Sequence, residues 1–296
     1  MRCACVDIGS NTTRVLVADV EDGRLREVMA AKAFTRLGRE LRRTGALSDD
    51  AVDLVTVTVA ELVAAARAAG ADRVRVVATA AIRGAGNGDA LCARVRERIG
   101  QPVDVLSGEE EARLAFAGAT RTLDRPLGGT IAVVDVGGGS SEIAVGTEHG
   151  GVSWSASVDV GSSALADGCL DSDPPCHDEL REAARHAAAA FAGLDVPPVD
   201  HAIAVGGSAT STARLVGPVI APDAIAAAIV KLGSAPAAEV ARTHGLEPER
   251  VRLLPAGLFL LAAAARRLGR PLDVGRGGLR EGACLELALT GPSHDP

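Results

Sequence analysis

One short pattern occurs twice in the chain. Residues 6–20 read VDIGSNTTRVLVADV and residues 134–148 read VDVGGGSSEIAVGTE. Both follow V-D-x-G, four further residues, one charged residue and then an apolar run. A duplicated domain, each copy opening with the same β-hairpin, is the simplest explanation. The repeat predicts an N-terminal domain at 1–118 and a C-terminal domain at 119–296, with a hinge in 118–130 and a last helix able to pack back on the first domain.

The rest of the chain alternates between strand-like and helix-like patterns, which is typical of an α/β protein. Strands are expected at 3–9, 14–20, 74–83 and 103–108, where the third runs into a loop. Helices are expected at 50–69, at 88–99 and from Glu109. Residues 253–265 predict a buried helix, 35–43 a loop and 171–176 a surface turn.

The two hairpin turns differ from the usual glycine-rich nucleotide loops. A dinucleotide loop opens a helix, but here the glycines are followed by EIAVGT, which has strand character. A P-loop requires Gly-Lys-Ser/Thr, and no lysine lies near. Glycine lets backbone N–H groups converge on an anion without a Cβ in the way. The alternatives are a phosphate-binding hairpin and an ordinary tight turn, and the repetition of the pattern favours phosphate.

Acidic residues accompany both turns: Asp7 in the first, Asp135 and Glu142 in the second. A carboxylate beside a phosphate is repulsive unless a cation lies between them. Oxygen ligands of this kind suit a hard divalent ion. The sequence therefore predicts a Mg²⁺ site that uses Asp135 and Glu142, with Asp7 as a weaker candidate ligand.

Composition excludes several classes of partner. The chain has no Tyr, one Trp and four Phe, and its formal charge is −7. It therefore lacks the stacking side chains and the basic field of a nucleic-acid-binding protein. The longest apolar stretch, residues 253–265, is too short to span a bilayer, and MRCACVDIG does not resemble a secretory signal. We expect a cytoplasmic protein whose six cysteines are reduced, with a Cys169–Cys176 pairing as the minor alternative.

Six motifs occur in order along the chain: DIGSNTTR (7–14), ATAAIRGAGN (78–87), LSGEEEARLAFAG (106–118), DVGGGSSE (135–142), GGSATS (206–211) and GLREG (278–282). Together they resemble the exopolyphosphatase / guanosine pentaphosphate phosphohydrolase (Ppx/GppA) family of the actin, sugar kinase and heat-shock ATPase superfamily. The resemblance implies two ribonuclease-H-like (actin-like ATPase) domains facing one another across a cleft. It also implies removal of the terminal phosphate from inorganic polyphosphate, or conversion of pppGpp to ppGpp, with Mg²⁺.

The three consecutive acids at 109–111 can be separated on physical grounds. Ser107 and Glu110 have the spacing of a capping box, and Glu109 stands four residues before Arg113, a spacing that favours a surface ion pair. Glu111 shares a helical face with small and apolar residues, where a carboxylate is costly unless it is used. In the family the catalytic glutamate immediately precedes Ala, which is again Glu111. We expect Glu111 to act as general base and Glu142 to align water or bind metal.

The remaining site residues are predicted to bind phosphate. Arg83 is the best candidate for neutralising the developing charge. Arg14 can instead point along its strand, and Arg280 can be structural. The GGSATS segment predicts either phosphate contact or a plain turn, with Ser208 where the family usually has Thr. The full predicted set is Gly9, Ser10, Asn11, Arg14, Arg83, Gly137, Gly138, Gly139, Ser140, Gly207, Ser208 and Thr210.

Two departures from the family pattern affect substrate choice. The chain stops near Pro296, without the C-terminal helical extension of long members, so processive action on long polyphosphate is not expected. Residues 160–170 lack the Arg-Leu-Thr pattern common after the second loop. A basic contact is therefore missing, or it is supplied by Arg36 or Arg39.

Two other functions stay open at this point. An ATP-dependent small-molecule kinase shares the superfamily fold, but it would need an acceptor-site aspartate and an adenosine pocket. A non-catalytic sensor of ppGpp or polyphosphate would bind without turnover. The sequence does not rank polyphosphate against pppGpp, and it leaves the oligomeric state open, with a homodimer as one option.

Overall fold

Strand β1 (Arg2–Ile8) is apolar along almost its whole length because both of its faces are covered. In a computed structural model of the chain, which describes residues 1–290, the side chains of Ala4, Val6 and Ile8 enter one apolar cluster. Those of Cys3 and Cys5 enter a second cluster. Successive side chains of a strand point to opposite faces, so β1 lies at the centre of a sheet with helices on both sides.

The chain divides into two units. The first contains residues 1–122 and 277–290, and the second is Leu123–Arg276. The boundary predicted at 118/119 lies inside a helix, because the apolar pattern of that helix continues for a further turn. The last helix belongs to the first unit rather than to the second.

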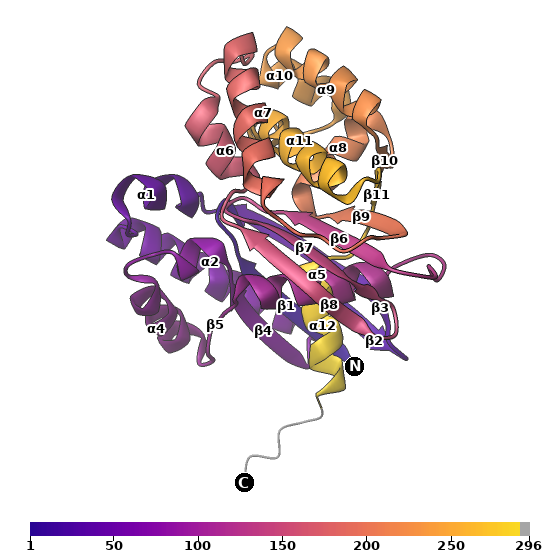
Figure 1. Cartoon of the computed structure of the whole chain (residues 1–296). Coiled ribbons are helices and arrows are strands. Elements are labelled where there is room, and N and C mark those ends of the chain that lie inside the picture. The colour runs from indigo at the N-terminus through magenta and orange to yellow at the C-terminus, as the bar shows by residue number, and fades with distance from the viewer. Residues whose placement is uncertain (291–296) are drawn as a thin grey trace. The chain divides into compact units, whose positions relative to one another are not determined.

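The first unit is a five-stranded sheet in the order β3-β2-β1-β4-β5 (Figure 1). Strands β1, β2 and β3 are antiparallel neighbours, whereas β4 and β5 run parallel to β1. Helices α2 and α4 cover one face, and α5 and α12 cover the other. The elements are β1, β2 (Thr12–Glu21), β3 (Arg24–Phe34), α1 (Leu37–Thr44), α2 (Asp49–Ala68), β4 (Arg73–Ala78), α3 (Ala80–Arg83), α4 (Gly88–Ile99), β5 (Asp104–Val105), α5 (Gly108–Arg121) and α12 (Leu279–Leu289).

The second unit repeats this plan in a six-stranded sheet, β10-β11-β9-β6-β7-β8. Strands β6, β7 and β8 form the antiparallel part, and β9 and β11 run parallel to β6. The elements are β6 (Ile131–Val136), β7 (Ser141–Thr147), β8 (Gly151–Val158), α6 (Ser162–Cys169), α7 (His177–Ala192), β9 (His201–Val205), α8 (Gly206–Val216), β10 (Val219–Ile220), α9 (Pro222–Ser234), α10 (Ala237–His244), α11 (Pro248–Leu268) and β11 (Leu272–Val274). The two sheets share a strand order, as the sequence repeat predicts.

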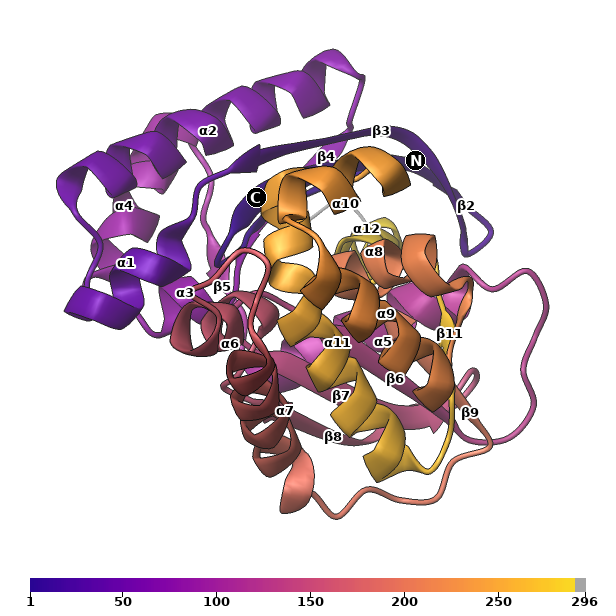
Figure 2. The ribbon, with the colours of Figure 1, turned by 90° about the horizontal axis from the view of Figure 1, so that it is seen from above.

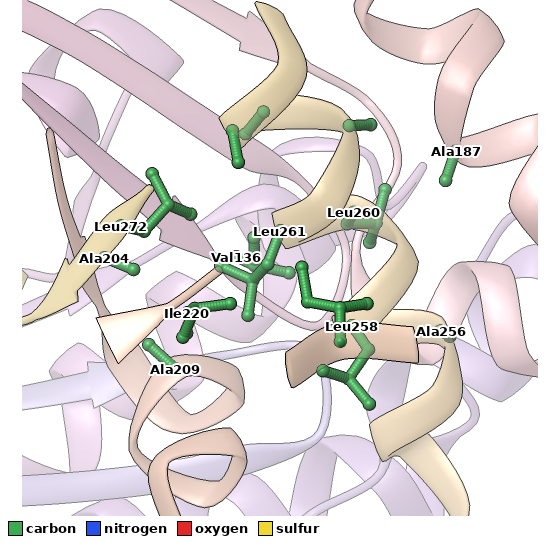
Figure 3. Close-up of a cluster of buried hydrophobic side chains, with 14 of the residues drawn as sticks. Val136, Ala187, Ala204, Ala209, Ile220, Ala256, Leu258, Leu260, Leu261 and Leu272 are labelled. Atoms are coloured by element: carbon green, nitrogen blue, oxygen red, sulfur yellow. The ribbon is translucent and has the colours of Figure 1, made fainter. Parts of the chain in front are cut away.

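Helix α11 is the centre of the second unit's core, and the buried helix expected at 253–265 lies within it. Leu258, Leu260 and Leu261 of this helix are fully buried, and Figure 3 shows them among Ile220, Leu272 and Val136. Helices α7, α9 and α10 pack around α11 (Figure 2). Within residues 1–290, no helix combines the length and hydropathy that crossing a bilayer requires.

Three local expectations were wrong. Residues 35–43 form helix α1 rather than a loop, because Leu37 and Leu41 place one short apolar face on the core. The GGSATS segment opens helix α8. Arg113 donates to Glu286 of α12 at 3.0 Å instead of pairing with Glu109. All six cysteines are free, so Cys169 and Cys176 are not bonded.

Helices α5 and α12 touch through their backbones, and glycines make this contact possible. A Cβ added at Gly118 would lie 2.0 Å from the carbonyl oxygen of Gly278, and one added at Gly282 would lie 2.0 Å from that of Leu114. Real Cβ atoms do not approach so closely. The packing of α12 on α5 therefore depends on the absence of side chains at these positions.

We predict that Gly282→Ala separates the two helices and destabilises the first unit by about 2–3 kcal/mol, the usual cost of overpacking a core. Urea unfolding followed by circular dichroism measures the change. Gly193→Ala, at a position with no atom near its Cβ, is the control and should be close to neutral. Equal stability of the two variants would contradict this account of the helix contact.

A second local contact holds the surface turn 171–176 against helix α7. The carboxylate of Glu179 accepts hydrogen bonds from the amides of Cys176 at 2.7 Å, Ser172 at 2.9 Å and Asp171 at 3.0 Å. These bonds, above all that from Cys176, lower the pKa of Glu179 to about 2 from an ordinary 4.5. The folded state therefore stabilises the ionised Glu179 carboxylate more than the unfolded state does.

We expect Glu179→Gln to destabilise the protein by about 1 kcal/mol at pH 7, the usual value of a helix-capping carboxylate. Because the folded pKa is lowered, this stability is fully present above about pH 4.5 and is lost as the pH falls toward 2. Unfolding curves at pH 7 and pH 3.5 should show the difference from wild type shrinking at the lower pH. A difference that stays constant would show that ionised Glu179 is not its source.

Candidate active site

The first hairpin turn, residues 9–11 between β1 and β2, is held by helix α1. The amide of Gly38 donates to the carbonyl of Ser10 at 2.8 Å, and those of Thr35 and Arg36 donate to Asn11 at 3.1 and 3.0 Å. The amide of Gly9 closes the turn on the carbonyl of Thr12. Within residues 1–290 the amides of Ser10 and Asn11 donate to no protein acceptor. Two predicted phosphate ligands thus offer N–H groups to an anion.

Asp7 lies just before this turn, with one carboxylate oxygen buried. Its Oδ1 atom has no hydrogen-bond partner among the described residues. Burial raises the pKa of Asp7, a rise that the positive Arg14 and Arg280 oppose and Glu281 reinforces. A buried carboxylate oxygen without a partner is costly, and a bound cation or an ordered water would satisfy it. Asp7 therefore fits the predicted role of metal or water ligand.

Arg14 stands opposite Asp7 in the β1–β2 pairing. Its Nε atom donates to the hydroxyl of Thr12, two residues earlier on the same strand, at 2.8 Å. The side chain therefore lies along the hairpin near the turn. Arg280, at the start of α12, is close enough to Asp7 to act on its pKa.

Glu111 is buried at the beginning of α5, with only 6% of its surface exposed. The helix starts with the predicted capping box: the Glu110 amide donates to the Ser107 hydroxyl at 3.2 Å, and the Ser107 amide donates to Glu110 at 2.8 Å. This cap fixes the first turn and directs Glu111 inward. Glu111, the residue predicted to act as general base, is therefore a buried carboxylate, as the apolar face of the helix indicated.

Arg83 contacts Glu111 directly, which the sequence did not indicate. Its Nη1 atom donates to Oε1 of Glu111 at 2.5 Å and to the carbonyl of Leu106 at 2.6 Å. The guanidinium offsets the cost of burying the carboxylate and fixes its position. Arg83 was predicted as a phosphate ligand, but its Nη1 atom is already hydrogen-bonded to protein acceptors. Its side chain is 29% exposed, which leaves other N–H groups accessible.

The second hairpin turn, residues 137–140 between β6 and β7, is held by helix α6. The carbonyl of Gly137 accepts from the amide of Ser162 at 2.8 Å, and that of Gly138 accepts from Ser163 at 3.0 Å and Ala164 at 3.1 Å. A Cβ on Gly161 would lie 2.4 Å from the carbonyl carbon of Gly138. In the described part of the chain, the amides of Gly138 and Gly139 donate to no protein acceptor. This turn, like the first, presents N–H groups, and the buried Ser140 closes it.

Asp135 and Glu142 face each other across the β6–β7 hairpin. Glu142 is 4% exposed and accepts a hydrogen bond from the Ser157 hydroxyl at 2.8 Å. Asp135 lies against the start of α8, since a Cβ on Gly206 would come within 2.4 Å of its Oδ1. Gly206 has φ +82, which excludes most side chains as well. The two predicted metal ligands are therefore neighbours held by the same hairpin.

The hydroxyls of the GGSATS segment already have partners. Ser208 donates to the carbonyl of Val136 at 3.0 Å, and Thr210 donates to that of Gly206 at 3.0 Å. Ser208 is buried and connects α8 to β6, so its hydroxyl serves the fold rather than a phosphate. The start of helix α8 at Gly206 and Gly207 is the part of this segment suited to an anion, because amides point outward there.

The acidic side chains of the candidate site do not form a complete metal-coordination site by themselves. Among residues 1–290, no group of three or more His, Cys, Asp and Glu side chains could hold a metal ion. Mg²⁺ is usually held by one or two carboxylates, with waters and substrate phosphates completing the octahedron. The Asp135–Glu142 pair fits that kind of donor set.

Comparison with known proteins places these features in a family. The sequence model of the Ppx/GppA phosphatase family matches residues 16–290. The chain is 30% identical to Exopolyphosphatase 2 of Mycobacterium tuberculosis, covering 97% of this chain and 98% of that protein. It is 29% identical to Exopolyphosphatase 1 of Mycobacterium leprae, over 96% and 89% of the two chains.

The solved structures agree. The crystal structure of the Aquifex aeolicus member of the Ppx/GppA family superposes with a TM-score of 0.82 at 27% identity and covers 98% of each chain. An exopolyphosphatase-like protein of known structure matches with the same TM-score at 25% identity, over 97% of each chain. These matches confirm the predicted α/β class with two actin-like domains. On the extent of these matches and the order of its motifs, the chain belongs to the Ppx/GppA phosphatase family.

Proposed function

We propose that the chain is a Mg²⁺-dependent exopolyphosphatase that releases the terminal phosphate of inorganic polyphosphate. The observation that carries the proposal is the buried Glu111 carboxylate, held by Arg83 at the head of α5. Two relatives that match almost the whole chain are named exopolyphosphatases, which supports polyphosphate as substrate. The compound pppGpp ends in the same phosphoanhydride bond and is proposed as a second substrate.

In this reaction Glu111 accepts a proton from the attacking water. The water oxygen forms a bond to the terminal phosphorus, and the bond from phosphorus to the bridging oxygen breaks. The bridging oxygen leaves with the shortened chain, and orthophosphate is released. A positioned general base of this kind contributes roughly 10²–10⁴ in rate. Arg83 acts as a positioning residue because its Nη1 holds Oε1 of the carboxylate.

The hairpin turns bind the phosphate oxygens through backbone amides. Ser10 and Asn11 supply these groups in the first unit, and Gly138 and Gly139 supply them in the second. Because the turn carbonyls are bonded to helices α1 and α6, the turns are set before substrate arrives. Preorganised donors of this kind stabilise charge that develops in the transition state.

Asp135 and Glu142 of the second unit would hold Mg²⁺. The ion would supply charge neutralisation on the non-bridging phosphate oxygens. The pairing of Asp135 with Glu142 across the β6–β7 hairpin supports this assignment.

We expect Glu111→Gln to lower kcat for phosphate release at least a hundredfold, because the amide cannot accept the proton. The assay measures orthophosphate from tripolyphosphate, long-chain polyphosphate, pppGpp and ATP. Glu109→Gln, which neutralises an exposed acid of the same helix turn, should retain wild-type rates. The best substrate distinguishes an exopolyphosphatase from a pppGpp phosphohydrolase.

Other outcomes would reject the hydrolase. ATP consumption that depends on an added acceptor would identify a kinase. Tight binding of ppGpp or polyphosphate with no release from any substrate would identify a sensor. Full activity of Glu111→Gln would show that another group activates the water.

We also predict that Asp135→Asn raises the Mg²⁺ concentration needed for half-maximal activity about tenfold or more, because a neutral amide binds the ion more weakly than a carboxylate. Removal of Mg²⁺ with EDTA should abolish phosphate release, and added Mg²⁺ should restore it. Asp195→Asn removes an exposed acid of the same unit and is the control. An unchanged Mg²⁺ requirement in Asp135→Asn would exclude this residue as a ligand.

A further inference from the structure

Helix α1 carries three arginines on one side, in a chain whose net charge is −7. With 100° between successive residues, Arg39, Arg42 and Arg43 fall within an arc of about 100°. Leu37, on the opposite side, is buried in the first unit's core, and Leu41 packs against the same core. The three arginines are exposed. We call them the α1 arginine face.

No acid of the helix neutralises this face. Glu40 is the only acidic residue between positions 36 and 47, and its Oε1 accepts a hydrogen bond from the amide of Ser48 at 3.1 Å. Within residues 1–290, Arg39 and Arg43 take part in no ion pair or hydrogen bond of their side chains. The guanidinium groups of Arg39 and Arg43 are therefore available to bind an anion with several charges.

The face adjoins the first hairpin turn. Gly38 donates to the carbonyl of Ser10 at 2.8 Å, and the space where its Cβ would stand lies 3.3 Å from Cβ of Ser10 and 2.9 Å from Nη1 of Arg42. The arginines therefore begin beside the turn and continue along the helix. From Leu37 to Arg43 the helix rises about 9 Å. A linear anion starting at the turn would follow this direction.

The surroundings favour a chain of charges over a nucleoside. The aromatic residue preceding the helix, Phe34, already has the ammonium of Lys32 at 5.4 Å and the guanidinium of Arg36 at 5.9 Å from its ring centre. A base would have to displace these cations in order to stack. Guanidinium groups instead bind phosphate oxygens through paired N–H donors.

We propose that the α1 arginine face binds the non-reacting phosphates of a condensed phosphate chain whose terminal phosphate lies at the first hairpin turn. The inference rests on the proposed exopolyphosphatase function and specifies its substrate. Arg39 and Arg43 are the principal ligands, and they select longer inorganic chains over short ones.

The test compares Arg39→Gln/Arg43→Gln with Arg96→Gln/Arg98→Gln, which removes the same charge from exposed positions of α4. Binding of long-chain polyphosphate is measured by calorimetry at several salt concentrations, in a Glu111→Gln background so that the chain is not consumed. The Arg39/Arg43 variant should bind about tenfold more weakly, and its log–log salt slope should fall by about 1 to 2. The Arg96/Arg98 variant should match the parent.

Kinetics with Glu111 intact provide the second readout. The KM for long-chain polyphosphate should rise about tenfold more than that for tripolyphosphate in Arg39→Gln/Arg43→Gln, since a short chain reaches fewer arginines. Arg39→Lys/Arg43→Lys keeps the charge and should recover most of the salt slope, but only part of the affinity. Circular dichroism confirms that each variant is folded.

The outcomes separate this inference from the proposed function. Equal affinity and salt slope in the two double variants would overturn the arginine site, whatever the enzyme hydrolyses. If the Arg39/Arg43 variant binds more weakly but wild type releases no phosphate, the arginine binding site is supported and the hydrolase is rejected. Absence of polyphosphate binding in the parent would reject both.

Discussion

The carbonyl oxygens of both hairpin turns are hydrogen-bonded to the amides at the start of a helix, and the candidate site depends on this arrangement. In the first unit Gly38 donates to Ser10, and in the second Ser162 and Ser163 donate to Gly137 and Gly138. Once the carbonyls are used in this way, the remaining turn amides are the groups presented to a ligand. Glycines at 38 and 161 permit the close approach. The two units therefore share a backbone contact as well as a strand order.

Glu111 illustrates how the fold maintains a charge in its interior. The carboxylate is nearly inaccessible, so it must be compensated by a partner at close range. Arg83 provides that compensation from the end of β4 and α3, while the capping box of α5 sets the direction of the helix. The position of α5 in turn depends on α12, through glycines that bring the two backbones together. The position of the Glu111 carboxylate thus depends on packing between residues that are far apart in the sequence.

Much of this organisation could be predicted from the residues. Helix α4 begins and ends where expected, since Gly100 in the left-handed region stops it, and α2 begins after the Ser48 cap. Strand β3 was not anticipated, because it is an edge strand with mixed polarity and exposed residues on both faces. Helix α1 and the start of α8 were assigned as loop and turn because they are short and contain glycine, and packing against the core decides their conformation. The acids of the candidate site were selected by their spacing in the sequence. The Arg83–Glu111 pair was not found, since the two residues are 28 positions apart and no local pattern connects them.

The glycine contact between α5 and α12 has a consequence for the order in which the molecule is assembled. Residues 123–276 form one uninterrupted unit, whereas the first unit is built from two segments that flank it. During synthesis the ribosome delivers the second unit in full before α12 emerges. The half of the protein translated first is therefore the half completed last. Until then the helix that carries Glu111 lacks its neighbour, and a nascent chain has its glycine turns before the position of Glu111 is fixed.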